Sequence, residues 1–552
     1  MNNNIPGFKG EICFSGGSDY ETARQQYATS SYPTKDMSPY MIAFPKDEAD
    51  ISLGIQFAKD QGKKIVARSG GHQYTGKSSG GDDTVVFDME YFSDRSIEVV
   101  DGKKFATVGP GLRLEKIAAF FKDNHVTIPH GECPKVAIGG HAQTGGYGHL
   151  ARSFGLALDW VRSFDIILAD GKKRTITHPT LYNNAGSEID EQLNRDIFWA
   201  VLGGNAGSFG IVTQYTFECI QDEDHPNSYG YTCTRLYDKN VYKNLMKCVQ
   251  DWSQRIDNDT LPPGLDFMMT VASDAFSSIF DRFAVSLLLV ELVYADIKNK
   301  DGSDVDYMAE FQPIKYAAGS DMSGTDKFLD TVSNIADLLG ADDQFGEVDA
   351  KKSLSELSYS FVRKPPISIT EDGREFKYPY KKRVNCTVNA LSDTFIDKFA
   401  NMIDKVVDQE TGSGVHLVFQ MVFGGSKYKE NGDLGYTSIP HRDLNFQFVF
   451  DLFYERGCEK KAIDFQDEMQ KIVEDHFNSD GQEQRMFWGT FNTQGQGVIG
   501  SANDIRDPAV RKMFYDSEDQ YKRLQEIKKQ VDPTDIFSTE LTVKLPGTPD
   551  RC

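Results

Sequence analysis

The sequence has 552 residues, of which 39% are hydrophobic and 26% are charged, and its formal net charge at pH 7 is −22. This length predicts two to four domains with sizeable cores. The acidic balance argues against a nucleic-acid or anionic-membrane partner, and there is no run of eighteen apolar residues that would indicate a membrane span.

The two ends of the chain and the cysteines contain no recognisable targeting signal or disulfide pattern. The first residues lack the basic and apolar regions of a secretory signal, and the last ones form neither a peroxisomal address nor a prenylation box. The eight cysteines are scattered, with no C-x-x-C pair, which excludes a disulfide scaffold. We therefore expect a cytoplasmic or other intracellular protein, either a monomer or a weak homo-oligomer.

The first two hundred or so residues alternate β-rich runs with helical stretches. Strands are expected at 63–70, 84–89 and 104–111, and helices at 47–62 and 113–125. A glycine-rich segment at 131–148 follows, and after it a strand region at 161–178 with a hairpin turn at Asp170-Gly171.

Beyond residue 218 the glycine-rich turns become fewer, and sheet-type runs occur at 282–295, 415–425 and 445–454. Residues 391–407 read as an amphipathic helix capped by Ser392 or Asp393. We predict an α+β protein. Its predicted domains are 1–220 and 221–495, followed by a C-terminal segment, 496–552.

The stretch Gly71–Ser78, "GHQYTGKS", matches the phosphate-binding loop of nucleotide hydrolases. That loop works only where it opens a helix whose N-terminal amides hold the phosphates. Here Ser78 is followed by "SGGDDTVVFDM", in which two glycines and a new strand leave no room for a helix. A nucleotide hydrolase is therefore retained only as a minor alternative.

The second glycine-rich segment, "PHGECPKVAIGGHAQTGGYGHLARSFGLALDWV" at 129–161, contains one cysteine, Cys133. His130, Cys133 and His141 match no common zinc spacing. The other two interpretations are a nucleophilic cysteine, whose partners the sequence does not show, and a thiolate that anchors an electrophilic cofactor ring.

Four ordered segments carry a family resemblance: "RSGGHQYTGKSSG", the cysteine segment above, "FWAVLGGNAGSFGIVTQ" and the terminal "VDPTDIF". Together they resemble the vanillyl-alcohol-oxidase-type (PCMH-type) flavoproteins, in their berberine-bridge-enzyme-like and oligosaccharide-oxidase branch. The resemblance is strong over the first 220 and last twenty residues and weaker between them. It implies a two-part FAD-binding domain, a substrate domain with a large antiparallel sheet, and a C-terminal segment that packs back on the FAD-binding domain.

The resemblance implies a FAD cofactor held by two covalent links. His72 matches the histidine that bonds the flavin 8α-methyl group, and Cys133 matches the cysteine that bonds flavin C6. The glycines allow backbone amides to approach the cofactor closely. The further cofactor contacts that we expect are Arg68, Ser69, Gly70, Gly71, Gly139, Gly140, His141, Thr144, Gly145, Gly146, Gly148, Gly207, Gly210 and Ile211.

The match weakens where the family places its catalytic base. Sugar-oxidising relatives carry a Tyr-x-Asn, and here the corresponding residues are Thr490 and Asn492. A threonine hydroxyl is too weakly acidic to serve as a base near pH 7. Tyr74, two residues after His72, is the best remaining phenol, so the predicted catalytic residues are Tyr74, Thr490 and Asn492.

Relatives also carry a carboxylate or a glutamine a few residues before a Gly-Gly pair. In this sequence the corresponding stretch is "FQMVFGGSKY", where we expect that residue to be replaced by Phe419, Met421 or their neighbours. A later polar strand position falls on Gln447 or Val449, depending on the register. These substitutions predict a rather apolar substrate pocket, although the same residues are equally well explained as sheet core.

From the resemblance we expect an oxidoreductase that transfers hydride from a small, fairly apolar organic substrate to flavin N5, with O₂ as the reoxidant. A carbohydrate oxidase is the alternative. A flavin-fold protein that binds without redox turnover also remains open, because the expected tyrosine is missing.

Overall fold

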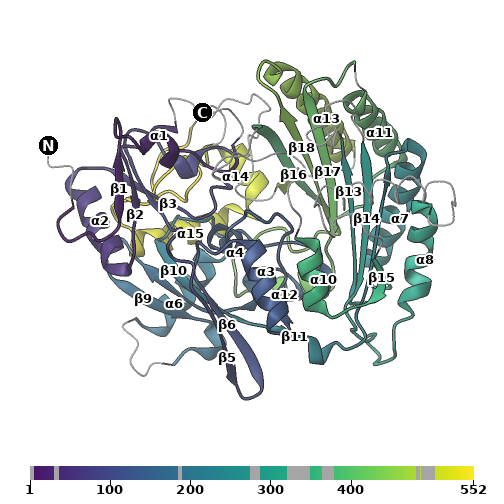
Figure 1. Ribbon diagram of the computed structural model, residues 1–552, viewed down its shortest axis with the longest axis horizontal. Coiled ribbons are helices and arrows are strands. Elements are labelled where there is room, and N and C mark those ends of the chain that lie inside the picture. Colours follow the sequence, from purple (N-terminus) through teal and green to yellow (C-terminus); the bar gives the residue numbers. More distant parts are fainter. Residues whose placement is uncertain are drawn as a thin grey trace.

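The computed structural model describes residues 5–29, 37–183, 189–273, 286–319, 348–362, 378–408, 410–479, 481, 485–486 and 504–551. In Figure 1 the N-terminal half and the C-terminal segment form one body, and a second body contains a tall sheet covered by helices on its outer side. Across the described residues, no helix is long and apolar enough to cross a membrane.

The N-terminal body begins with a four-stranded sheet in the order β1-β2-β4-β3, in which β2, β4 and β3 are parallel. Parallel strands need crossover connections, and helix α2, capped by Asp47, lies in the connection from β2 to β3, the two strands that flank β4. The bounds are β1 Glu11–Phe14, α1 Tyr20–Ala23, β2 Met41–Phe44, α2 Glu48–Asp60, β3 Lys64–Arg68 and β4 Thr84–Asp88.

A five-stranded antiparallel sheet in the order β5-β6-β10-β8-β9 follows, with helices packed against it. Its inner side chains share one core with α3 and α6, built around Ile117, Phe164, Phe198 and Tyr215. The bounds are β5 Arg95–Val100, β6 Lys103–Val108, α3 Leu114–Asp123, β7 Val126–Thr127, α4 Ile138–Gln143, α5 Ala151–Phe154, β8 Val161–Ile167, β9 Lys173–Thr177, α6 Glu191–Val201, β10 Ile211–Glu218 and β11 Ile220–Gln221.

The second body is built on an eight-stranded antiparallel sheet in the order β15-β12-β14-β13-β17-β18-β16-β19. Helices α7, α8 and α11 cover its outer face, and its other face is turned towards the N-terminal body (Figure 1). The bounds are β12 Tyr229–Leu236, α7 Lys239–Asp257, β13 Leu265–Ala272, β14 Leu287–Tyr294, α8 Tyr307–Ala318, β15 Val348–Lys351, α10 Leu354–Phe361, β16 Tyr380–Thr387, α11 Asp393–Val407, β17 Val415–Phe423, α12 Lys427–Asp433, β18 Phe446–Tyr454, α13 Glu459–Ser479 and β19 Arg485–Met486.

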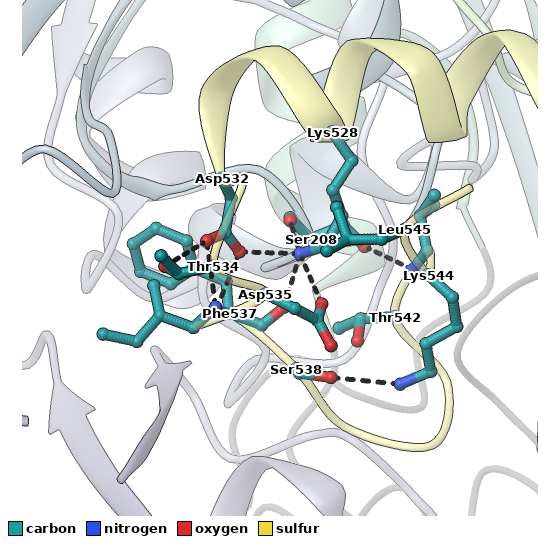
Figure 2. A network of polar contacts seen from close by, with 12 residues as sticks. Ser208, Lys528, Asp532, Thr534, Asp535, Phe537, Ser538, Thr542, Lys544 and Leu545 are labelled. Carbon is teal, nitrogen blue, oxygen red and sulfur yellow. Dashed lines mark hydrogen bonds and ion pairs between the residues drawn. The ribbon is translucent and has the colours of Figure 1, made fainter. Parts of the chain in front are cut away.

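The C-terminal segment, with α14 Pro508–Phe514 and α15 Glu518–Val531, returns to the N-terminal body and is fixed there by one buried amine. Lys528 Nζ lies 2.8 Å from the Asp532 carboxylate and donates at 2.8 Å to the carbonyls of Ser208 and Phe537 (Figure 2). The Ser208 hydroxyl in turn accepts the amide of Val543. This network joins the end of the chain to the glycine-rich turn before β10.

The predicted α+β class is confirmed, and so are the helices at 47–62, 113–125 and 391–407, the last of them capped by Ser392. Segment 131–148 was predicted only as glycine-rich, and it also contains helix α4. The domain boundaries at 220 and 495 stay predictions, although the eight-stranded sheet lies between residues 229 and 486.

Candidate active site between the two bodies

His72 lies in the turn that follows β3, where Gly71 has a φ of +67°. A Cβ on Gly71 would lie 2.8 Å from the backbone nitrogen of Tyr27, so only glycine fits this close approach. The ring of Tyr27 stacks on the His72 imidazole at 4.4 Å. Burial and the nearby charges of Lys382 and Arg113 hold the pKa of His72 well below its usual value. The imidazole is therefore neutral, and one of its two ring nitrogens keeps a nucleophilic lone pair.

Cys133 lies in the loop before α4, and a second histidine orders that loop. His141 Nε2 accepts the Gly131 amide at 3.0 Å, which requires the neutral ring, and burial lowers the pKa of His141 to about 3. Gly148 packs so closely on this loop that a Cβ there would overlap the carbonyl of His130. Burial raises the pKa of Cys133 to about 11, so its sulfur is a protonated thiol at neutral pH.

The residues around these two side chains fit a flavin. The Nε2 atom of His72 is buried and has no hydrogen-bond partner within the described part of the chain. Cβ atoms on Gly140 and Gly207 would meet nothing within 4 Å, so both backbones border open space. Gln143 links the two glycine-rich segments, because its amide oxygen accepts the Gly207 amide at 3.2 Å and its amide nitrogen donates to the Gly139 carbonyl at 2.9 Å. A nucleophilic imidazole, a thiol and open glycine backbones are the features that two covalent flavin links require.

The sheet face turned towards these anchors holds a buried polar array. Lys382 Nζ of β16 donates to the Tyr74 hydroxyl at 3.2 Å, lies 4.6 Å from the Tyr74 ring centroid and pairs with the Asp451 carboxylate of β18 at 3.1 Å. Burial raises the pKa of Asp451 to about 6, with Lys382 opposing the shift, and Asp451 and Tyr74 keep the pKa of Lys382 well above its usual value despite its burial. Lys382 and Asp451 therefore form an ion pair at neutral pH.

The same contacts set the acidity of Tyr74. Burial raises the pKa of its phenol, Lys382 lowers it and the Asp451 carboxylate raises it. Sequence reasoning found Tyr74 but missed Lys382 and Asp451. One signal was available: Asp451 is the single charged residue in the aromatic run "FQFVFDLFY".

The predicted register of β17 is wrong by one residue. Phe419 and Met421 are buried in the core between the sheet and its outer helices, where Phe419 packs 4.9 Å from the Phe399 ring of α11. Because successive strand residues point to opposite faces, Gln420 is turned towards the N-terminal body. Gln420 donates there to the Glu132 carboxylate and, at 3.2 Å, to Thr270. A glutamine therefore occupies the position that the sequence analysis took to be apolar.

The other predicted substrate residues lie on β18, where Gln447 and Val449 alternate with Phe446, Phe448 and Phe450 of the outer core. Val449 belongs instead to the core of the N-terminal body, so both residues are on the inner face. The predicted catalytic residues Thr490 and Asn492 lie outside the described residues.

Three predicted cofactor contacts have other roles for their side chains. The guanidinium of Arg68 is buried, pairs with Asp88 at 2.8 Å and donates to the carbonyls of Ala23 and Gln25. The Thr144 hydroxyl donates to the Gly140 carbonyl, and Ile211 belongs to a core cluster. These three side chains make structural contacts within the protein, and their contacts with a cofactor stay predictions.

Most of the remaining predicted cofactor contacts are glycines whose backbone packs closely against neighbouring residues. A Cβ on Gly70 would lie 2.7 Å from the nitrogen of Ala137, and one on Gly139 would press on the Ser69 hydroxyl. Similar close contacts occur at Gly146 and Gly210, and Gly145 has a φ of +114°. The two glycine-rich segments therefore lie directly against each other.

The residues that spell the phosphate loop serve to fix the His72 turn. Lys77 pairs with Glu540 of the C-terminal segment at 2.9 Å, and the Ser78 hydroxyl donates to Gln26 at 2.7 Å. Lys77 opens only a three-residue 3₁₀ turn, which Gly80 ends with a φ of +63° before β4 starts. Because no α-helix follows the loop, it has no helix N-terminus for a phosphate.

Comparison with known proteins agrees with this geometry. The signature described as "FAD binding domain" matches residues 39–177, and the one described as "Berberine and berberine like" matches residues 502–544. The aclacinomycin-N/aclacinomycin-A oxidase of Streptomyces galilaeus is 35% identical over 524 residues, which are 89% of this chain and 83% of that protein. The chain belongs to the berberine-bridge-enzyme-like family. It is an FAD-linked oxidoreductase of this family, with the PCMH-type fold.

Two further relatives extend the comparison of this berberine-bridge-like protein. The glucooligosaccharide oxidase of Sarocladium strictum is 25% identical over 519 residues, or 92% of this chain and 88% of that one. The solved structure of the Acremonium strictum glucooligosaccharide oxidase, described as carrying a 6-S-cysteinyl, 8α-N1-histidyl FAD, aligns with a TM-score of 0.67 at 21% identity and covers 97% of both chains. At that identity the structural match establishes the fold.

Proposed function

We propose that this protein is a bicovalent FAD-linked oxidase that converts a hydroxyl group of a polar organic substrate into a carbonyl group. The observation that carries the proposal is the buried Tyr74–Lys382–Asp451 array on the sheet face opposite His72 and Cys133. A bound FAD supplies the acceptor for the two electrons that leave the substrate as hydride, and O₂ returns it to the oxidised state with formation of hydrogen peroxide.

His72 and Cys133 are the residues that would hold the flavin. The neutral His72 imidazole is oriented by stacking on Tyr27, and the Cys133 thiol is held in place by the His141-ordered loop. The glucooligosaccharide oxidase of Acremonium strictum has the same two kinds of link, to a cysteine and to a histidine, which supports this assignment.

Tyr74 would take the proton from the substrate hydroxyl. A phenol is a poor base while it is protonated, but the Lys382 ammonium directly stabilises the phenolate. Gln420 and Gln447 offer amide groups on the same face for the other polar groups of a substrate. These side chains favour a hydroxyl-rich substrate over the apolar one that Phe419 and Met421 suggested.

Two measurements test the proposal. Yellow colour that stays with the acid-precipitated polypeptide indicates covalent flavin; His72→Ala and Cys133→Ala should each retain one link, and the double variant should release FAD. Oxygen consumption and peroxide formation should then be measured with oligosaccharides and with aclacinomycin N, the two substrate types suggested by the relatives' names. Colour that survives precipitation of the double variant would refute the anchors. If no hydroxyl-bearing substrate reduces the flavin, the result would favour the alternative of a flavin-fold protein that binds without redox turnover.

A further inference from the structure

The segment 24–29, which we call the N-terminal strap, crosses the turn that carries His72. The Ala28 amide donates to the Gly71 carbonyl at 2.9 Å, and a Cβ on Gly71 would lie 2.8 Å from the Tyr27 backbone nitrogen. The strap precedes residues 39–177, which match the FAD-binding signature. The turn that presents the histidine is therefore held by a segment outside that signature.

The side chain of Gln26 fastens the strap to the residues that follow His72. Its amide nitrogen donates to the Gln73 carbonyl at 2.7 Å, and its amide oxygen accepts the hydroxyls of Ser78 at 2.7 Å and Ser79 at 3.2 Å. Gln26 is buried, so the loss of these partners is costly. The strap therefore has one defined position on the His72 turn.

From this position Tyr27 restrains the His72 imidazole. The two ring centroids are 4.4 Å apart and the interplanar angle is 23°, which is a stacked arrangement. Tyr27 is only 4% exposed, so its own ring is fixed by the surrounding protein. Because rotation of a histidine ring about its last torsion is otherwise broad, the stack sets the direction in which the ring nitrogens point.

The far end of the strap reaches the eight-stranded sheet. The Tyr380 amide of β16 donates to the Thr29 carbonyl at 3.0 Å. The Tyr380 ring in turn meets the Tyr74 ring edge-on, with 5.2 Å between the centroids. The strap therefore connects the flavin-anchor turn to the strand that carries Lys382.

Formation of a histidyl link depends on the direction of the His72 lone pair. The link replaces an 8α C–H bond of the flavin by a C–N bond. The 8α carbon and the imidazole each release one proton, and the two electrons pass through the flavin to O₂, which becomes hydrogen peroxide. The reacting nitrogen has to approach the carbon to about 3–3.5 Å, and a displacement of about 1 Å can slow such a step about 100-fold.

We propose that Tyr27 is a positioning residue for the histidyl link to the flavin, and that the cysteinyl link forms without it. The Cys133 loop is ordered separately, because His141 accepts the Gly131 amide there. This inference rests on the proposed function only in taking His72 and Cys133 as the two anchors.

The test measures each link alone. Cys133→Ala reports the histidyl link and His72→Ala reports the cysteinyl link, and Tyr27→Leu and Tyr27→Phe are placed in both backgrounds. Covalent flavin is followed in the acid-precipitated polypeptide while the purified protein is incubated with FAD in air. With Cys133→Ala, Tyr27→Leu should slow attachment roughly 10–100-fold, and Tyr27→Phe, which keeps the stack, should restore it. With His72→Ala, Tyr27→Leu should leave the cysteinyl link unchanged, which also shows that the variant folds and binds FAD.

A second variant and a matched control complete the design. Gln26→Ala loosens the strap without touching the imidazole and should slow only the histidyl link; it decides the question by the same criterion if Tyr27→Leu does not fold. Tyr378→Leu removes another aromatic ring of the Tyr27 cluster, one that lies 5.7 Å from His416, and should leave both links unchanged.

Two results would overturn the proposal. One is an equal attachment rate in Cys133→Ala with and without Tyr27→Leu, and the other is an equal loss of both links in folded protein. If Cys133→Ala and His72→Ala hold no covalent flavin even with Tyr27 intact, the anchors themselves are wrong, and the proposed bicovalent attachment fails together with this inference.

Discussion

The electrostatic control of Tyr74 gives the sharpest prediction, because its two charged neighbours act in opposite directions. A unit charge 3.2 Å from the phenolate oxygen, in a medium of effective dielectric constant near 20, stabilises it by about 5 kcal/mol. General-base catalysis contributes roughly 10²–10⁴-fold to a rate, which is the same order of energy. Lys382→Met should therefore reduce kcat/KM at pH 7 by roughly 10²–10⁴-fold.

The pH profile separates this role from a merely structural one. Lys382 lowers the pKa of Tyr74, so its removal should move the rise of kcat/KM to higher pH. Asp451 raises the same pKa, so Asp451→Asn should move the rise to lower pH. The measurement is steady-state peroxide formation from pH 5 to 10, normalised to covalent flavin.

Lys381 is the matched control for this experiment. It neighbours Lys382 on β16, and its amine pairs with Glu459 at 3.3 Å and lies over the Tyr454 ring, among residues of the outer face. Lys381→Met should leave the position of the pH profile unchanged. If Lys382→Met and Asp451→Asn move the profile in the same direction, or not at all, Tyr74 is not the base.

Three further predictions concern stability and register. Lys528→Met leaves a buried carboxylate without its cation and should cost about 3–5 kcal/mol in denaturant unfolding; a cost within error would show that the network in Figure 2 is not a stabilising hub. The pKa of His141 falls from 6.5 to about 3 on folding, so the unfolded chain takes up a proton at this histidine as the pH falls below 6.5 while the folded protein does not, and the free energy of unfolding decreases. His141→Gln should reduce this decrease between pH 6.5 and 3 by about 5 kcal/mol, and an unchanged slope would contradict the reasoning. Phe419→Ala should lower the free energy of unfolding by about 3–5 kcal/mol with little change in KM, because Phe419 lies in the outer core. Val449→Ala should change KM, because Val449 lies on the inner face of the sheet. The reverse pattern would show that Phe419, as expected from the sequence, faces the substrate.

The sequence by itself determined the features that depend on local order. A histidine after two glycines, a cysteine before a glycine-rich helix and the terminal "VDPTDIF" occur in a fixed order, and together they identified the family and its cofactor. Local sequence also rejected the phosphate loop, because glycines after Ser78 cannot continue a helix. Helix caps such as Ser392 were readable for the same reason.

Only the tertiary structure decided which side chains meet at the site. A slip of one residue in β17 exchanges Phe419 for Gln420, because strand side chains alternate between faces, and the sequence pattern did not fix that register. Lys382 reaches Tyr74 across 308 positions of the chain, and Glu291 meets His149 across 142. Such pairs are set by the docking of the sheet on the N-terminal body, and no periodicity within either segment encodes that arrangement.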